Sequence, residues 1–245
     1  MRVPRIYTGQ ALNNAIELVL EPEASHHLKR VLRMGVGDAV TLFNGEGGEY
    51  ASTIAAIAQK TVTLKVIERK DNDRESPLAI HLGIAVSRGE RMDWIIQKAT
   101  ELGVYHISPL FTDRVEVKLS RDRIEKKMRH WQEIVVSACE QCGRNIPPQV
   151  SPPQNMSGWL AATQANRKFV LHHRANSRPD ALGEPSSIAL LVGPEGGLSP
   201  TEIEEAENNG YAALSLGPRV LRTETAPLAA IAILQNKWGD MTAHA

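Results

Sequence analysis

The pattern of hydrophobic and polar positions divides the chain into two parts. Up to about residue 70, short segments rich in Val, Ile, Leu and Thr alternate with turn residues such as Asn44-Gly45-Glu46-Gly47-Gly48, which predicts a small β-rich unit. Four or more short strands at this spacing favour a compact barrel. The strands are expected at residues 16–20, 39–43, 50–57 and 61–67.

A helical turn is expected to interrupt this unit at residues 26–33. Its hydrophobic side chains have the spacing for burial on one face: Leu28, Val31 and Leu32. Its basic side chains would then face outward: Lys29, Arg30 and Arg33. Together with Arg2 and Arg5 they form a candidate surface for phosphate contacts. On charge alone, a solvated helix face is the commoner explanation.

Residues 70–77 are entirely polar or turn-forming, and they make the best domain boundary in the chain. After them strands and helices alternate, which predicts an α/β domain with a largely parallel sheet. The predicted domains are residues 1–72 and 73–245. In the second domain, strands are expected at residues 78–86, 104–110, 168–171, 188–192 and 212–216, and helices at about residues 90–102, 121–142, 156–164, from 199 onward, and 225–238.

The last of these helices carries hydrophobic residues on more than one face. We therefore expect it to be buried nearly all round, either in the domain core or against a second subunit. Its hydrophobic residues are Leu228, Ala229, Ile231, Ala232, Ile233 and Leu234.

Composition and charge exclude several classes of protein. Hydrophobic residues make up 42% and charged residues 23% of the chain, which is ordinary for a soluble globular protein rather than a disordered one. Lys+Arg and Asp+Glu both total 28, so the chain is not a polycation, and any anionic partner must be held by local patches. The N-terminus lacks the hydrophobic region of a signal peptide, and the longest hydrophobic run, residues 226–234, is too short to span a bilayer. A cytoplasmic protein without a membrane partner is expected.

A metal site is not indicated by the sequence. The two cysteines, Cys139 and Cys142, lack a second CxxC or a nearby His pair to complete a tetrahedral zinc site. They lie within a helical pattern, so we expect buried, reduced cysteines. His26 and His27 have no third ligand indicated beside them.

Two glycine-containing loops follow two short hydrophobic runs near the C-terminus. The first, Gly193-Pro194-Glu195-Gly196-Gly197, leads into Ser199, Pro200 and Glu202, which have the spacing of a capping box with a proline at the first helical position. This loop has neither the Gly-Lys-Ser/Thr end of a Walker A motif nor the spacing of a dinucleotide fingerprint.

The second loop, residues 216–226, indicates that the first loop is part of a ligand site. Loops at the carboxyl ends of neighbouring strands form the crevice in which open α/β sheets bind ligands. Arg219 and Arg222 add cationic donors to this second loop. We therefore expect the ligand between the two loops.

These loops carry a resemblance to a known family. Val-Gly-Pro-Glu-Gly-Gly-Leu-Ser (192–199), with the loop Leu-Gly-Pro-Arg-Val-Leu-Arg-Thr-Glu-Thr-Ala (216–226), resembles the SPOUT superfamily of S-adenosylmethionine-dependent RNA methyltransferases. Three further motifs resemble the RsmE family within it, which methylates N3 of a uridine in small-subunit (16S) ribosomal RNA: Ser-Arg-Gly-Glu-Arg-Met (87–92), Gln-Lys-Ala-Thr-Glu-Leu-Gly (97–103) and Glu-Gln-Cys-Gly-Arg-Asn (140–145).

The resemblance implies a fold and an assembly. It implies an N-terminal PUA-like barrel for RNA contact and a C-terminal α/β domain whose last segment forms a trefoil knot. Hydrophobic periodicity by itself shows no knot, and the general rule is against one. The resemblance further implies a homodimer that acts on ribosomal RNA or on the small ribosomal subunit.

The resemblance also implies a cofactor site. S-Adenosylmethionine would lie on three loops, after Leu171, at 193–197 and at 216–226. The residues assigned to it are Leu171, His172, Leu191, Gly193, Pro194, Glu195, Gly196, Gly197, Leu216, Gly217, Val220, Leu221, Arg222, Thr225 and Ala226. The basic surface formed by Arg2, Arg5, Lys29, Arg30 and Arg33 becomes the candidate RNA platform.

Methyl transfer to N3 of uracil needs a nucleophile that has lost its proton, and a nearby cation would stabilise the resulting anion. Our candidates to hold that anion or a flanking phosphate are Arg144, Arg88 and Arg222. Glu140 and Glu224 are candidates to accept a proton or to orient these arginines, and the alternative for each is a structural ion pair. The sequence does not identify the base. Ribose 2′-O methylation and a non-catalytic RNA-binding function stay open as alternatives.

Overall fold

The structure, a computed structural model, describes residues 3–72, 74–115, 120–172 and 183–241. The chain divides into two compact units. The first comprises residues 1–75 and 136–147, and the second comprises residues 76–135 and 148–245. The sequence predicts two continuous domains, whereas the contacts in the structure assign the segment 136–147 to the first unit.

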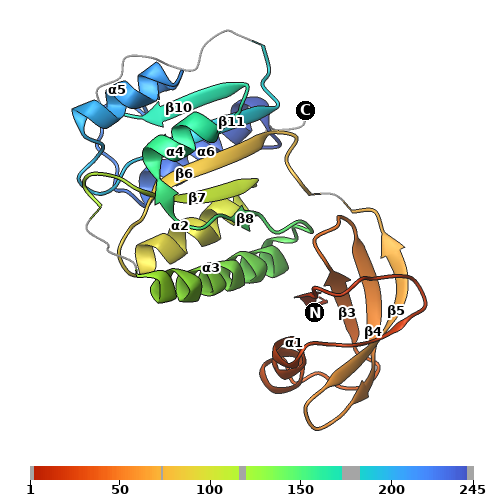
Figure 1. Cartoon of the computed structure of the whole chain (residues 1–245). Helices are drawn as coiled ribbons and strands as arrows, with labels where there is room; N and C mark the ends of the chain where they lie inside the picture. Colours follow the sequence, from red (N-terminus) through yellow and green to blue (C-terminus); the bar gives the residue numbers. More distant parts are fainter. Residues whose placement is uncertain (1–2, 73, 116–119, 173–182, 242–245) are drawn as a thin grey trace. The chain divides into compact units, whose positions relative to one another are not determined.

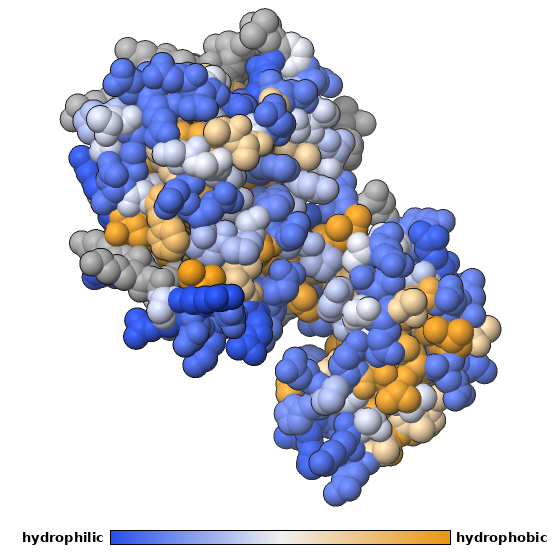
Figure 2. Space-filling model, in the orientation of Figure 1, coloured by the Kyte–Doolittle hydropathy of each residue, from blue (hydrophilic) through white to orange (hydrophobic). Residues whose placement is uncertain are grey.

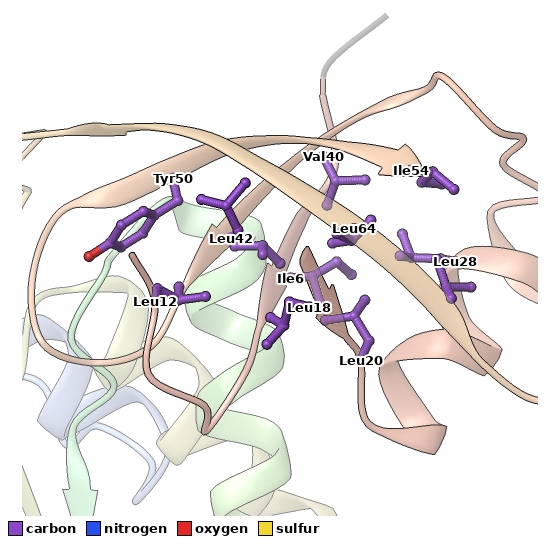
Figure 3. Close-up of a cluster of buried hydrophobic side chains, with 12 residues drawn as sticks. Ile6, Leu12, Leu18, Leu20, Leu28, Val40, Leu42, Tyr50, Ile54 and Leu64 are labelled. Carbon is purple, nitrogen blue, oxygen red and sulfur yellow. The ribbon is translucent and has the colours of Figure 1, made fainter. Parts of the chain in front are cut away.

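The first unit is built on a five-stranded sheet of order β1-β3-β4-β5-β2. Only β1 and β3 pair in parallel, and the other neighbouring strands are antiparallel. The side chains of one sheet face pack into a single hydrophobic core (Figure 3). The four predicted strands are confirmed, and β1 is an addition. The elements are β1 (Arg5–Tyr7), β2 (Glu17–Val19), α1 (Pro22–His26), β3 (Ala39–Phe43), β4 (Glu49–Ile57) and β5 (Val62–Lys70).

The helical turn of this unit continues beyond α1 as a π-turn, η1 (His27–Val31). The amide of Leu32 donates to the carbonyl of His27, five residues earlier, at 3.0 Å. A π-turn contains more residues than an α-turn, so side chains with α-helical spacing no longer share a face. Leu28 is buried as predicted, but Val31 and Leu32 are 60% and 41% exposed, so their predicted burial is wrong.

The second unit is an α/β unit with a seven-stranded sheet, in which all pairings are parallel. The predicted α/β fold with a largely parallel sheet is confirmed, as are the five predicted strands and the five predicted helices. The strands are β6 (Ala79–Ala85), β7 (His106–Phe111), β8 (Gln149–Val150), β9 (Gln154–Asn155), β10 (Arg167–Leu171), β11 (Ser187–Val192) and β12 (Ala212–Leu214). The helices are α2 (Glu90–Glu101), α3 (Arg121–Cys142), α4 (Met156–Ala162), α5 (Pro200–Asn208) and α6 (Thr225–Trp238).

Helices cover both faces of this sheet (Figure 1). This arrangement explains why β11 is a continuous hydrophobic run, since successive side chains point to opposite faces and both faces are buried. Ala189 and Leu191 pack in one cluster with Trp159 and Leu160 of α4.

The strand order places the two loops of the sequence analysis beside each other. The sheet runs β12-β10-β11-β6-β7-β8, with β9 also paired to β7. Because the strands are parallel, their carboxyl ends meet at one edge. β10, β11 and β12 end there at Leu171, Val192 and Leu214, followed by the ends of β6 and β7. The knot expected from the family resemblance stays a prediction.

The last helix, α6, is buried along one face only in this chain. Pro227, Ala230, Ile231, Leu234 and Gln235 are buried, whereas Ile233 is 46% exposed. The side-chain amide of Gln235 donates to the carbonyls of Leu102 and Gly103, which fixes the buried face against the end of α2. Of the two predicted alternatives, burial by the domain core alone is therefore wrong, and burial against a second subunit stays a prediction.

The face of the protein drawn in Figure 2 is mainly hydrophilic, with smaller groups of hydrophobic side chains. Within the part of the chain that the structure describes, no helix has the length and hydrophobicity to cross a membrane. Neither cysteine forms a disulfide bond, and Cys139 is buried as expected, whereas Cys142 is only partly buried.

Candidate cofactor site

A cavity lies at the carboxyl ends of β10, β11 and β12. Its walls are Leu171 and His172 at the end of β10, the loop 193–198 that follows β11, and the segment 214–226 that runs from β12 into α6. The amide of His172 donates to the carbonyl of Leu214 at 3.2 Å, so the ends of β10 and β12 are joined at the base of the cavity. The structure thus brings together the end of β10 and the two glycine-containing loops that the family resemblance assigns to a cofactor.

Most of the predicted cofactor residues line this cavity. The exceptions are Leu191, which is fully buried in β11, and Arg222 and Thr225. Five further lining residues are not among the predicted cofactor contacts: Val192, Leu198, Leu214, Arg219 and Thr223. Leu198 lies within the motif 192–199, and Leu214 lies two residues before the motif 216–226. Their positions next to these motifs could have assigned them to the site.

Glycine is required by the geometry of the loop 193–198. A Cβ atom added at Gly193 would lie 2.9 Å from Cγ and 3.0 Å from the backbone nitrogen of Leu198. Gly197 has a φ of +68°, a conformation that favours glycine. Its amide donates to the carbonyl of Pro194 at 2.8 Å, which closes the turn. Backbone groups are therefore accessible in this wall at its glycine positions.

The helix after this loop begins as the sequence predicts. The hydroxyl of Ser199 accepts from the amide of Glu202 at 3.2 Å, and the Glu202 carboxylate accepts from the amide of Ser199 at 2.7 Å. This capping box and Pro200 start α5. The loop is thereby fixed at its carboxyl end.

The lining suits S-adenosylmethionine by its chemistry. Leucine side chains offer hydrophobic contacts to a nucleobase, and the glycine loop offers backbone amides and carbonyls that no Cβ atom shields. Backbone carbonyls also suit a cationic sulfur. The residues present therefore fit this cofactor.

A second cavity adjoins the first across the loop after β11. It is lined by residues 86, 88–91 and 113–115, and it shares Glu195 and Gly196 with the cofactor cavity. Arg88, one of the predicted catalytic residues, lies in it. This cavity is situated over β11, β6 and β7, which are consecutive in the sheet. A substrate bound there would be next to the cofactor.

Two other predicted catalytic residues, Arg144 and Glu140, belong to the first unit. Arg144 is 5% exposed and donates to Glu75 through Nε and Nη2, at 2.9 and 2.5 Å. The Glu140 carboxylate accepts from the amide of Tyr7 at 3.0 Å. Burial raises the pKa of Glu140, and the hydrogen bond from the Tyr7 amide, which lowers this pKa, only partly offsets the effect. Both side chains thus contribute to packing within this unit.

Arg5, a predicted RNA contact, is also part of this packing. It forms an ion pair with Glu49 and donates through Nη2 to Asn145 Oδ1 at 2.6 Å and to the carbonyl of Arg144 at 3.1 Å. Its side chain is 7% exposed. Lys29, another predicted RNA contact, donates through Nζ to the carbonyls of Ala58 and Gln59, at 2.8 and 3.2 Å.

The remaining predicted contacts are more accessible. Arg30 and Arg33 are exposed, and Arg33 has a φ of +53°, which is uncommon for a residue other than glycine. Arg222 is 83% exposed and lies 3.9 Å from the Glu224 carboxylate. Arg2 lies outside the described residues. The functional roles of all these side chains stay predictions.

Metal ligands are not grouped in the described ranges, where no three His, Cys, Asp or Glu side chains come together.

Comparison with known proteins decides the family. Residues 74–235 match the model of the RNA methyltransferase domain, and residues 20–67 match that of the RNA methyltransferase PUA domain. The chain belongs to this RNA methyltransferase family. The β-rich first unit predicted from the hydrophobic pattern is therefore the PUA domain of the family.

Named relatives match this chain along nearly its whole length. The ribosomal RNA small subunit methyltransferase E of Buchnera aphidicola subsp. Schizaphis graminum is 39% identical over 243 residues, which cover 98% of this chain and 99% of the relative. The protein of the same name from Bacillus subtilis is 32% identical over 237 residues, 93% of each chain.

Solved structures of the family show the same fold. A methyltransferase from Legionella pneumophila in complex with the bound cofactor S-adenosylmethionine has a TM-score of 0.95 and 42% identity, over 98% of this chain and 100% of that one. The ribosomal RNA small subunit methyltransferase E from Neisseria gonorrhoeae, bound to S-adenosylmethionine, has a TM-score of 0.92 and 37% identity over the same shares.

Proposed function

We propose that this protein transfers a methyl group from S-adenosylmethionine to small-subunit ribosomal RNA. The observation that carries the proposal is the cavity formed by the end of β10 and the loops after β11 and β12, in a chain whose relatives are ribosomal RNA methyltransferases. Two structures of the family hold S-adenosylmethionine. The acceptor proposed from the family resemblance is N3 of a uridine.

The chemistry asks mainly for positioning. When bound, S-adenosylmethionine supplies a methyl group that the positive sulfur has already activated. The glycine loop and the hydrophobic walls then have to hold it in line with the acceptor, and positioning of this kind supplies up to about 7–11 kcal/mol of the barrier.

The acceptor itself needs help from a cation. N3 of uracil is a poor nucleophile until its proton leaves, and a cation beside the uracil oxygens stabilises the anion. Arg88 is the best placed of the three arginine candidates, because it lines the cavity that adjoins the cofactor loop. Arg144 is held by Glu75 in the first unit, and Arg222 is largely exposed. We therefore assign the acceptor side to Arg88.

The assembly we propose is a homodimer that acts in the cytoplasm, where ribosomal subunits are made. Support comes from α6, whose outward face carries Ile233 at 46% exposure beside the partly exposed Leu228, Ala229 and Ala232. A hydrophobic helix face of this kind is typical of a surface that a second subunit covers. α6 also begins at the cofactor cavity through Ala226, so a partner on α6 would lie close to the reaction.

The experiment is transfer of labelled methyl from S-adenosylmethionine to isolated small subunits and to naked ribosomal RNA, followed by nucleoside analysis. We expect label on uracil N3. Label on a ribose would replace our acceptor by the 2′-hydroxyl, the alternative that shares the cofactor loops. Absence of transfer to either substrate, together with absence of cofactor binding at millimolar concentration, would leave a non-catalytic RNA-binding protein.

A further inference from the structure

The segment after β7 is bound to the cofactor loop by hydrogen bonds that the family motifs do not indicate. The amide of Asp113 donates to Oε1 of Glu202 at 2.8 Å, and its carboxylate Oδ2 accepts from the hydroxyl of Ser199 at 2.8 Å. Glu202 is 6% exposed, and its other oxygen accepts from the amide of Ser199. The capping box of α5 thus connects β7 to the end of the cofactor loop.

Arg114 extends this connection into the loop itself. Its Nη1 atom donates to the carbonyl of Gly196 at 2.6 Å and lies 3.4 Å from the carbonyl of Leu198. The side chain runs along the glycine backbone, because a Cβ atom added at Gly196 would lie 3.3 Å from Cδ and 3.5 Å from Cβ of Arg114. Gly196 and Leu198 both line the cofactor cavity.

The contact is made from the opposite side of the loop wall. Arg114 lines the second cavity, while the loop residues it holds face the cofactor cavity. A second cation, Arg91, is bound to the same wall through an ion pair with Glu195 at 2.8 Å, although both side chains are about half exposed. Arg91 holds a side chain, whereas Arg114 holds two backbone carbonyls. The position of the loop backbone therefore depends more on Arg114.

We propose that Arg114 is a positioning residue for the cofactor: it holds the carbonyls of Gly196 and Leu198 so that the loop after β11 keeps the shape that S-adenosylmethionine requires. The inference rests on the proposed function. It assigns a role in cofactor affinity to Arg114, which follows β7 and does not itself line the cofactor cavity. Since Arg114 is exposed, its removal costs the folded protein little.

The test is calorimetry of S-adenosylmethionine binding to the full chain without RNA. We expect Arg114→Ala to weaken binding roughly tenfold, which is the loss of about one charge-assisted hydrogen bond. Arg114→Lys keeps a cationic donor and should restore most of the affinity. The matched control is Arg129→Ala, which removes an exposed arginine from α3 in the same unit and should leave binding unchanged.

Two further readouts separate positioning from other roles. The melting temperature of the apo protein should be nearly equal in all three variants. Methyl transfer by Arg114→Ala should show a raised KM for S-adenosylmethionine with kcat largely retained, because saturating cofactor restores the loop.

Each outcome decides a different point. A wild-type protein that binds no S-adenosylmethionine would overturn the proposed function and this inference with it. Normal cofactor binding by Arg114→Ala, with wild-type binding intact, would overturn the inference alone. The same holds if the variant loses RNA affinity but not cofactor affinity, since Arg114 would then contact the substrate.

Discussion

Arg144 and Glu75 form a buried ion pair through two nitrogen atoms of the guanidinium group, Nε and Nη2. The exposed fractions of the two side chains are 6% and 18%. The pair lies next to Arg5, which donates to the carbonyl of Arg144 and to the side chain of Asn145. This network connects the end of α3 to residues 5 and 75 within the first unit, so its main effect should be on stability.

Replacing one partner of this pair should destabilise the protein strongly. Arg144→Ala removes the guanidinium partner of the Glu75 carboxylate, whose side chain is only 18% exposed, and loss of one partner of a buried ion pair typically costs about 3–5 kcal/mol. The double variant Arg144→Ala/Glu75→Gln should be less destabilised than the single one. Urea unfolding measures the free energies, and methyl transfer is assayed at a temperature where both variants are folded. A variant that is folded and as stable as wild type but inactive would instead make Arg144 catalytic.

The acid stability of the first unit should depend on Glu49. Burial raises the pKa of this carboxyl, but hydrogen bonds from Asn72 and Arg5 outweigh it, so the pKa lies below its ordinary value of 4.5. A lowered folded-state pKa stabilises the protein above pH 4.5, and this contribution is lost as the pH falls through the folded pKa. The stability difference between wild type and Glu49→Gln should therefore shrink on acidification. A difference that is constant between pH 7 and pH 3 would contradict this.

Glu140 should show the opposite dependence. Its pKa is raised by burial, so the folded state favours the protonated carboxyl. Stability from this group increases as the pH falls through the folded pKa toward 4.5. Glu140→Gln keeps an oxygen for the amide of Tyr7 and should be more stable to unfolding than wild type at neutral pH. This difference in stability should disappear in acid. Parallel pH series of urea unfolding for the two glutamine variants compare the signs directly.

Gly193→Ala should weaken cofactor binding. The added methyl would come within 3.0 Å of Leu198, so the loop has to shift, and overpacking of this kind costs typically 1–3 kcal/mol. We expect at least a tenfold higher Kd, measured by calorimetry. Gly158→Ala is the control, because a Cβ atom added at this helix position of α4 meets no atom within 4 Å. It should bind normally and gain about 0.5–1 kcal/mol in stability.

Arg30 and Arg33 should carry the RNA contact of the PUA domain. Replacing both by Glu is expected to weaken substrate binding and to lower the slope of log K against log salt by about one for each lost phosphate contact. Cofactor affinity should stay unchanged, which serves as the control for folding. Unchanged RNA affinity and slope would count against this surface as the RNA platform.

The outward face of α6 should hold the dimer together. Ile233→Glu places a charge on a face that would be buried between subunits, and sedimentation should show a shift from dimer to monomer. Ile67→Glu is the matched control, because Ile67 of β5 is a similarly exposed isoleucine at 51%. A wild-type protein that sediments as a monomer would refute the homodimer.

Local sequence determined most of the elements of this protein. The alternation of strands and helices after residue 77, the helix 121–142 and the capping box at Ser199 follow from hydrophobic period and from residues within one turn of each other. The two glycine loops could be recognised for the same reason, because the residues that their turns require lie close together in the sequence. The π-turn at η1 shows the limit of this reasoning: one extra residue in the turn exposes Val31 and Leu32, and hydrophobic spacing does not reveal it.

The tertiary structure decided which polar side chains are free to act. Arg5, Glu140 and Arg144 look like functional charges in the sequence, yet partners at residues 49, 7 and 75 bind them within the first unit. Arg114 carries no motif, but the sheet order β11-β6-β7 places it against the cofactor loop. The pairing of a charge with a carbonyl or carboxylate far away in the chain depends on how strands are ordered, and hydrophobic periodicity contains no information about that order.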